Sequence, residues 1–368
     1  MLYKNILKPI AFMFDPEFVH DRFVVLGGFL GRFSVTRAIT QKIYGYNGPD
    51  ISKVVDGITY RTPFLLSAGF DYNGRLTQIL PYVGFGGVEI GSVTAKKCRG
   101  NEKPRLLRLP KSKSIVVNKG LRNDGVDAII ERLKNAGVGS RTSDAEVDPR
   151  KHGPTIRGVI GVSIARTNDV SCVDTKSGID DYVYSFKRLN EENVGDYYTL
   201  NISCPNSFGG ESFADAVLLE RLMVEIDKIE CKKPIYVKMP ITIEWQKFDA
   251  VLQVLSKHRV NGVIIGNLNK DYASVAGDPD VPKQYSGGLS GEPCRVPSNE
   301  LIRKTRFNYG KRFTIIGCGG VMSSEHAQEK FDAGADLVQL ITGMIYEGPG
   351  LIRKLCGAYS SFQIQKDY

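Results

Sequence analysis

Eight short apolar runs, separated by segments with helical periodicity, constrain the fold of this chain more than any other feature. Each run has the length of a buried strand, is bounded by Gly, Pro or polar residues, and lacks the polar alternation of a half-exposed strand. The runs are PFLLSAGF, GGVEIGSV, RGVIGVSI, YYTLNIS, PIYVKM, GVIIGN, FTIIGCGG and LVQLIT. Apolar residues recur at helical spacing within 126–133, 217–226 and 248–255. The pattern predicts an α/β protein built as a (β/α)8 TIM barrel, with a doubly wound open sheet as the alternative.

The amino terminus differs in composition and predicts a helical extension. Residues 1–14 and 16–33 are rich in Phe, Leu and Val, and the Asp15-Pro16 pair between them is a helix stop and restart. We therefore divide the chain into an N-terminal helical extension, residues 1–45, and a barrel, residues 46–368. Two such helices fit the surface of a bilayer or, alternatively, cap the barrel or a partner subunit of an oligomer. No apolar run reaches the roughly 18 residues of a spanning helix.

The positive charge of the chain is concentrated in one segment. The formal net charge is +9, and residues 96–122 contain ten basic residues and one acid. This segment is either a solvated basic loop, the better interpretation for Lys111 and Lys113, or a positive rim for an anionic substrate or a membrane surface. It lacks the periodic helix and interleaved aromatics that read or stack bases, so we expect no nucleic-acid partner.

Cysteine and histidine usage predicts the compartment and argues against a metal. The seven cysteines form no CxxC pair, their number is odd, and we find no signal peptide before them. We therefore expect a reducing compartment, on the cytoplasmic side and peripheral to a membrane through the N-terminal helices. The four histidines follow no predicted strand and no HExxH spacing occurs, so we expect no catalytic metal.

Glycines gather where the last two apolar runs end. The seventh run ends in Gly319 and Gly320, and the eighth in Thr342-Gly343. Loops after strands seven and eight of such barrels often offer backbone N–H groups to a phosphate, and glycine permits the close approach. Together with SGGLSG at 286–291, this pattern indicates a cradle for a phosphorylated cofactor, although glycines in these places also serve as plain turns.

Two other strand ends contain reactive groups. Lys238 is the one charged residue of its strand, so its ammonium needs a partner inside or at the mouth of the barrel, which suits an anionic flavin or substrate oxygen. In LNISCPNS, residues 200–207, Cys204 is a candidate acid or base because a tuned thiol exchanges protons near neutral pH. Asn201 and Asn206 flank it as neutral donor–acceptor groups suited to a cyclic amide or imide.

These motifs resemble those of the dihydroorotate dehydrogenases, specifically the quinone-linked, membrane-associated class 2. The similarity extends from FDPEFVHD to IYEGPGLIRKL and includes SAGFDYNG, GFGGVEIGSVTAKKCRGNEKPRLLRLP, NISCPNS, GGLSGEP and IIGCGGV in the family's order. It implies a barrel that holds FMN, oxidises dihydroorotate to orotate in pyrimidine biosynthesis, and passes electrons to a quinone that enters between the N-terminal helices. A base would remove the C5 proton while the C6 hydride goes to the flavin.

The resemblance also implies roles for individual residues. The expected catalytic residues are Cys204 and Lys238. Cofactor-binding positions fall on Ala68, Gly69, Ser92, Asn118, Ser163, Asn201, Lys238, Ser290, Gly291, Gly319, Gly320, Thr342 and Gly343. Substrate-binding positions fall on Tyr72, Asn118, Arg122, Asn201, Asn206 and Asn267. His20 and Arg108 match polar residues of the quinone tunnel.

The pocket departs from the family's pattern at several of these positions. Cys204 stands where class 2 enzymes have a serine, and Tyr72 replaces the lysine that usually follows GFD. NKGLRND is one residue shorter than the usual NRxGFNN segment, with Arg122 as a candidate to restore the lost charge. Further changes are Leu121, Ser163, Leu268 and Ile341. Two alternatives therefore stay open: a divergent homologue acting on the C=C or C–C bond of another cyclic amide, and a non-catalytic flavoprotein.

Overall fold

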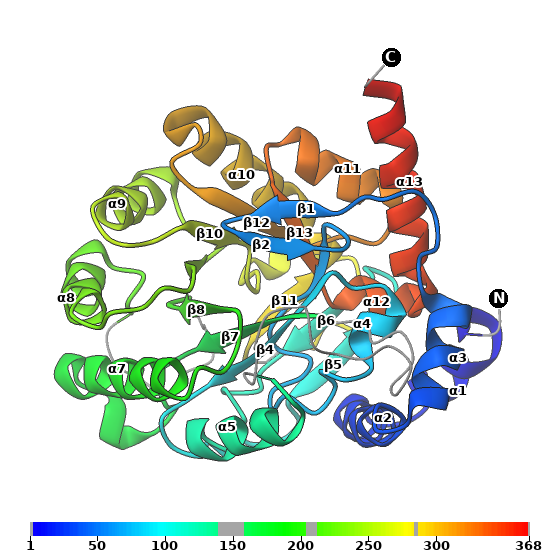
Figure 1. Cartoon of the computed structure of the whole chain (residues 1–368), viewed down its shortest axis with the longest axis horizontal. Coiled ribbons are helices and arrows are strands. Elements are labelled where there is room, and N and C mark those ends of the chain that lie inside the picture. Colours follow the sequence, from blue (N-terminus) through cyan, green and yellow to red (C-terminus); the bar gives the residue numbers. More distant parts are fainter. Residues whose placement is uncertain (1–2, 139–157, 204–211, 283–285, 367–368) are drawn as a thin grey trace.

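The centre of the molecule is a closed barrel of eight parallel strands (Figure 1). The computed structural model describes residues 3–138, 158–203, 212–282 and 286–366. Each barrel strand lies within one of the eight apolar runs, so the predicted barrel is confirmed and the open sheet is wrong. The strands are β3 (Phe64–Leu66), β4 (Gly87–Val93), β7 (Val159–Ile164), β8 (Tyr197–Asn201), β9 (Ile235–Met239), β10 (Gly262–Ile265), β12 (Thr314–Cys318) and β13 (Leu337–Leu340).

Helices surround this barrel, as Figure 1 shows. The three segments with clear helical periodicity are α5 (Val126–Asn135), α8 (Ala216–Asp227) and α9 (Trp245–Ser256), so these predictions are confirmed. From the barrel onward, the other helices of the described residues are α4 (Leu80–Val83), η2 (Val170–Cys172), α7 (Thr175–Glu191), η3 (Tyr272–Val275), η4 (Glu292–Cys294), α10 (Arg295–Tyr309), α11 (Ser324–Asp332), α12 (Thr342–Glu347) and α13 (Gly350–Lys366).

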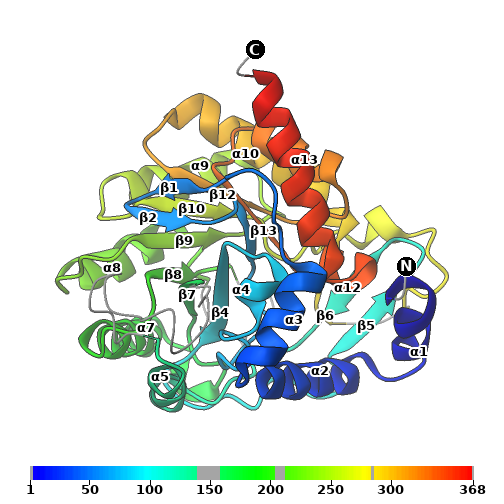
Figure 2. The ribbon, with the colours of Figure 1, turned by 45° about the vertical axis from the view of Figure 1, so that its right-hand side comes forward.

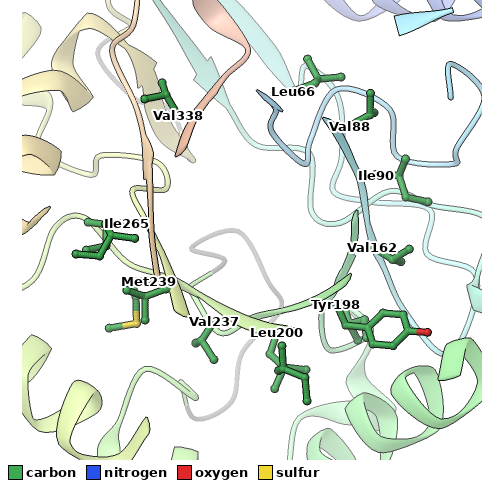
Figure 3. Close-up of a cluster of buried hydrophobic side chains, with 14 of the residues drawn as sticks. Leu66, Val88, Ile90, Val162, Tyr198, Leu200, Val237, Met239, Ile265 and Val338 are labelled. Carbon is green, nitrogen blue, oxygen red and sulfur yellow. The ribbon is translucent and has the colours of Figure 1, made fainter. Parts of the chain in front are cut away.

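Strand alternation determines which side chains enter the barrel. Figure 3 shows apolar side chains of alternate strand positions, among them Ile90, Leu200 and Val237, arranged around the outside of the strands. Successive residues of a strand point to opposite faces. Asn201 and Lys238, which directly follow Leu200 and Val237, therefore face the barrel interior near its carboxyl end.

A β-hairpin closes the amino end of the barrel. Its strands are β1 (Lys53–Val55) and β2 (Ile58–Tyr60), paired antiparallel. Val55 and Tyr60 belong to one buried cluster with Val159 and Tyr197, which begin strands β7 and β8. Because this end is filled, access to the barrel interior is from the opposite end, where the carboxyl ends of the strands meet.

A small sheet outside the barrel contains much of the basic segment. Strands β5 (Leu106–Leu109) and β6 (Ser114–Val117) form a hairpin, and β11 (Gly288–Gly291) pairs antiparallel with β6. The interpretation of residues 96–122 as a solvated loop is therefore wrong for these strands, while exposed Lys111 and Lys113 lie in the turn between them. The missed signal was the apolar content of LLRL and SIVV on either side of a Pro-containing turn.

The N-terminal helices lie together at the lower right of the molecule in Figures 1 and 2, where they are coloured blue. They are the π-helical turn η1 (Tyr3–Leu7), α1 (Lys8–Phe12), α2 (Pro16–Leu30) and α3 (Ser34–Tyr44). The predicted restart is confirmed, because the Asp15 carboxylate caps α2 by accepting from the Phe18 N–H at 2.8 Å. Helix α3 was not foreseen.

An unusual share of apolar surface belongs to this extension. Fourteen of the 23 exposed large hydrophobic side chains in the described structure lie before residue 45, and Leu26 and Phe29 are 53% and 54% exposed. Among the described residues, no single helix is long and apolar enough to span a bilayer; α2 and α3 reach that composition only jointly, across a bend of 116°.

Candidate active site

Polar side chains at the carboxyl ends of four barrel strands form one hydrogen-bond network. The hydroxyls of Ser163 and Ser92 lie 2.7 Å apart, and the Asn201 amide donates to Ser92 Oγ at 2.8 Å. Asn201 Oδ1 accepts from the Ser203 hydroxyl at 3.2 Å, and Asn267 Nδ2 donates to Ser203 Oγ at 2.7 Å. These contacts hold two carboxamides beside each other with fixed orientation. Ser163 lies behind Ser92, fully buried, and orients its hydroxyl.

Lys238 places an ammonium group beside this network. Its side chain is 4% exposed, and Nζ donates to the Ser67 hydroxyl at 2.8 Å. The expected partner at the barrel mouth is therefore present. Since an ammonium has three N–H donors, this hydrogen bond leaves capacity to bind an oxygen or nitrogen acceptor of a ligand.

Glycine loops form a second part of the site, next to Lys238. Gly319 and Gly320 have φ angles of +108° and +74°, which favour glycine. A Cβ at Gly320 would lie 2.4 Å from Cβ of Arg295, and one at Gly343 would lie 1.9 Å from the Val321 carbonyl oxygen. Beside these loops, the Thr342 hydroxyl donates to Ser290 Oγ at 2.9 Å. The backbone here is compact and bare of side chains, as a phosphate cradle requires.

Two adjoining cavities bring most of the sequence-predicted residues together. The central cavity, of about 180 Å³, is lined by His20, Ala68, Gly69, Tyr72, Ser92, Arg122, Asn201, Lys238, Asn267, Ser290 and Thr342, together with the unpredicted Lys119. The glycine-lined cavity, of about 80 Å³, adds Gly291, Gly319, Gly320 and Gly343. They share residues at the barrel mouth, Lys238 and Asn267 among them. The site is therefore continuous from the glycine loops to helix α2.

His20 and Tyr72 form the end of the central cavity nearest α2. His20 Nε2 lies 2.7 Å from the Phe70 carbonyl oxygen, and the Tyr72 hydroxyl lies 3.2 Å from His20 Nδ1. Burial lowers the pKa of His20, so the ring is neutral at pH 7. Because a carbonyl only accepts, Nε2 has the proton and Nδ1 accepts from Tyr72. The Tyr72 hydroxyl is thereby directed toward α2.

Arg122 and Arg108 are already engaged with the N-terminal extension. Arg122 Nη1 contacts Glu17 at 2.8 Å and Asp21 at 3.0 Å. Arg108 donates to the Phe14 carbonyl at 2.8 Å and does not line either cavity. Arg122 reaches the cavity edge, but its guanidinium is paired with two carboxylates of α2. These arginines attach the extension to the barrel.

Lys119, which sequence reasoning missed, is a buried cation in the central cavity. It is 8% exposed, and its Nζ lies 4.1 Å from the centre of the Tyr72 ring. Burial lowers its pKa to about 8. Lys119 is one of the ten basic residues of segment 96–122, which we interpreted as a solvated loop or a positive rim. No local sequence pattern distinguishes it from the other nine.

The remaining predicted residues either do not line the two cavities or lie outside the described residues. Asn118 accepts from the Asn101 amide at 2.8 Å and is not among the residues that line either cavity. Cys204 and Asn206 lie outside the described residues. Within the described ranges, no cluster of three His, Cys, Asp or Glu side chains could hold a metal ion.

Comparison with known proteins yields one family. A family model described as dihydroorotate dehydrogenase matches residues 51–361. A protein of Gloeobacter violaceus named dihydroorotate dehydrogenase (quinone) is 33% identical over 365 residues, which cover 98% of this chain and 94% of that protein. One of the same name from Burkholderia multivorans is 31% identical, with 94% and 95% of the two chains covered.

Solved structures share the fold. The ligand-free DHODH of Eimeria tenella superposes with a TM-score of 0.79 at 25% identity, covering 96% of each chain. The complex of the Eimeria tenella protein with ferulenol gives the same TM-score at 24% identity, over 96% of this chain and 93% of that one.

Proposed function

Because the chain belongs to the dihydroorotate dehydrogenase family, we propose that it oxidises dihydroorotate to orotate and passes the electrons to a quinone. The observation that carries the proposal is the barrel mouth where three groups of residues meet. These are the hydrogen-bonded carboxamides Asn201 and Asn267, the buried ammonium of Lys238, and the glycine loops. The carboxamides suit a cyclic amide, the ammonium suits the polar edge of an electron acceptor, and the glycine loops suit a phosphate.

The residues of the site fit FMN. Gly319, Gly320 and Gly343 would hold the phosphate through backbone N–H groups, because side chains at these positions would collide with neighbouring atoms. Lys238 would donate to the polar edge of the flavin, and the Ser92–Asn201 pair would contact the ring. Bound FMN would supply the hydride acceptor of the oxidation.

The protein's part in the oxidation is to bind the ring and remove a proton. Asn201 and Asn267, and on the family's pattern Asn118 and Asn206, would hydrogen-bond the amide groups of the substrate. The Cys204 thiolate would take the C5 proton while the C6 hydrogen leaves with its electron pair, so that a C5=C6 double bond forms. Cys204 is assigned from its sequence position after β8.

Quinone access is proposed along the apolar end of the central cavity. Leu106, Ile115, Val117 and Ile345 line it on one side, and His20 stands at its α2 end. The exposed apolar surface of α2 and α3 would lie in a bilayer interface, from which a lipid-soluble quinone enters. The protein would then be peripheral to the membrane.

An anaerobic titration tests the proposal. Dihydroorotate added to the purified, flavin-loaded protein is expected to bleach the visible flavin band, and a short-chain ubiquinone added next is expected to restore it. Bleaching by dihydrouracil but not by dihydroorotate would show that the substrate is another cyclic amide. A band that no candidate substrate bleaches would indicate a non-catalytic flavoprotein, and bleaching without recovery would exclude the quinone.

Gly320→Ala is expected to weaken FMN binding by at least about tenfold, because a positive φ costs a side chain about 1–2 kcal/mol and the new Cβ would also displace the Arg295 backbone. Fluorescence titration of apoprotein with FMN measures the change. Gly277→Ala is the control, since nothing lies within 4 Å of its Cβ position. Equal affinity of the Gly320 variant and the wild type would contradict the phosphate cradle.

The Leu26→Glu/Phe29→Glu double variant is expected to bind vesicles at least about 100-fold more weakly, since each buried apolar side chain contributes about 1.5–3 kcal/mol. Both side chains are more than half exposed in the structure, so folding should be unaffected. Co-sedimentation with phospholipid vesicles gives the partition coefficient. Phe307→Glu, at an 87% exposed position of α10, is the matched control. Unchanged partitioning of the double variant would exclude the α2 surface as the membrane contact.

A further inference from the structure

The Lys119 ammonium is buried, and no carboxylate of the described residues is in contact with it. Its side chain follows β6, lines the central cavity and is 8% exposed. Among the described residues, Nζ has no hydrogen-bond partner and no ion-pair partner; it lies over the face of the Tyr72 ring, 4.1 Å from the centroid. A buried charge of this kind is costly unless something pairs with it. The unused donors of Nζ are therefore available to a ligand of the cavity.

The nearby carboxylates already have other partners. Glu17 Oε1 is contacted by Arg122 at 2.8 Å and by Arg105 at 3.2 Å. Asp21 is paired with Arg122 at 3.0 Å. These acids raise the pKa of Lys119 while burial, the larger effect, lowers it to about 8, so the ammonium remains mostly protonated at pH 7.

The other basic side chains of the cavity are hydrogen-bonded, neutral or ion-paired. Lys238 is held by Ser67 at 2.8 Å, and His20 is neutral. Arg122 is neutralised by Glu17 and Asp21. Of the described cations that line the central cavity, Lys119 is the one with no polar contact.

We propose that Lys119 binds the carboxylate of the substrate and so makes the site specific for a ring that has one. This assignment rests on the proposed function, in which the substrate is dihydroorotate. Asn201 and Asn267 are neutral and suit the ring amides, but neither can balance a full negative charge. A carboxylate that enters the cavity loses its water, and an ammonium fixed in the same low-dielectric space replaces that hydration. The Tyr72 ring keeps Nζ in place while the cavity is open.

Lys119→Met tests this assignment because methionine keeps the length of the side chain and removes its charge. Orotate affinity is measured by isothermal titration and by the perturbation of the flavin spectrum, with uracil as the same ring without a carboxylate. We expect Lys119→Met to weaken orotate binding by at least about tenfold, the effect of losing one hydrogen bond to a charged group. Uracil binding should change little, so the orotate-to-uracil affinity ratio falls.

Two further variants separate a specific role from a structural one. Lys111→Met removes a lysine from the exposed hairpin turn of the same segment and should leave the ratio unchanged. Tyr72→Lys in the Lys119→Met background should recover part of the orotate affinity, because a lysine stem starting at residue 72 occupies the space under the Lys119 ammonium.

Each outcome bears on the assignment. Orotate binding to Lys119→Met within about threefold of wild type would overturn it. Loss of FMN retention with normal orotate affinity in the loaded fraction would also overturn it, because the ammonium would then serve the cofactor. If flavin-loaded wild-type protein binds no orotate, the proposed function fails first and the carboxylate assignment fails with it.

Discussion

Cys204→Ala is expected to slow reduction of the bound flavin by dihydroorotate by about 10²–10⁴-fold, the usual contribution of a general base, while FMN stays bound. The residue directly follows the strand end where Asn201 and Ser203 join the hydrogen-bond network of the site. Anaerobic stopped-flow spectroscopy, which follows the visible flavin band after mixing with substrate, gives the rate.

The control for this experiment is a thiol remote from the cavities. Cys231→Ala removes a half-buried cysteine between α8 and β9 that lines neither cavity, and its rate should equal that of wild type. The wild-type rate should also rise with pH as the thiol ionises, from an ordinary pKa of about 8.5, and this limb should vanish in Cys204→Ser. Reduction of the alanine variant at the wild-type rate would mean that another group is the base.

Lys238→Met is expected to weaken FMN binding by about 10–150-fold, because a hydrogen bond to a charged group is worth about 1.5–3 kcal/mol. The side chain is 4% exposed, faces the barrel interior and has one described hydrogen-bond partner, the Ser67 hydroxyl. Methionine fills nearly the same volume, so a cavity does not confound the result. Fluorescence titration of the apoprotein measures the affinity.

Ser67→Ala tests whether FMN binding depends on the Lys238 ammonium itself or on its hydrogen bond to Ser67. This variant removes the hydroxyl at 2.8 Å but leaves the ammonium, so FMN should bind within a few-fold of wild type. Thermal unfolding of both apoproteins checks that the barrel is intact. FMN affinity that is unchanged in Lys238→Met would remove this lysine from the cofactor site.

The sequence predicted most of the site because strand ends are local features. Once the apolar runs are recognised as parallel barrel strands, every residue just beyond their carboxyl ends is expected at one mouth. Asn201 and Lys238 were found in this way, whereas Asn267 was expected from the family resemblance. The structure places all three around one cavity. The glycine loops followed from the same argument.

Which of the basic side chains near α2 are ion-paired could not be predicted from strand ends. Tyr72 was noted as a lost cation and Arg122 as its replacement, but Arg122 is paired with Glu17 and Asp21. Lys119 is left as the cation with no polar contact among the described cavity residues. Pairing partners about 100 residues apart in the chain leave no periodic signal, so sequence patterns cannot say which of several nearby basic residues is neutralised.

The sequence by itself determined the barrel, the position of its mouth and the apolar character of the amino terminus, because burial and strand alternation are properties of short segments. Only the tertiary structure decided that β5, β6 and β11 form a separate sheet and that the β1–β2 hairpin fills the amino end. It also decided that, among the described residues, Lys119 rather than Arg122 presents an unpaired charge to the cavity. These features depend on contacts between distant segments, and electrostatic pairing between such segments is settled by packing rather than by any local pattern.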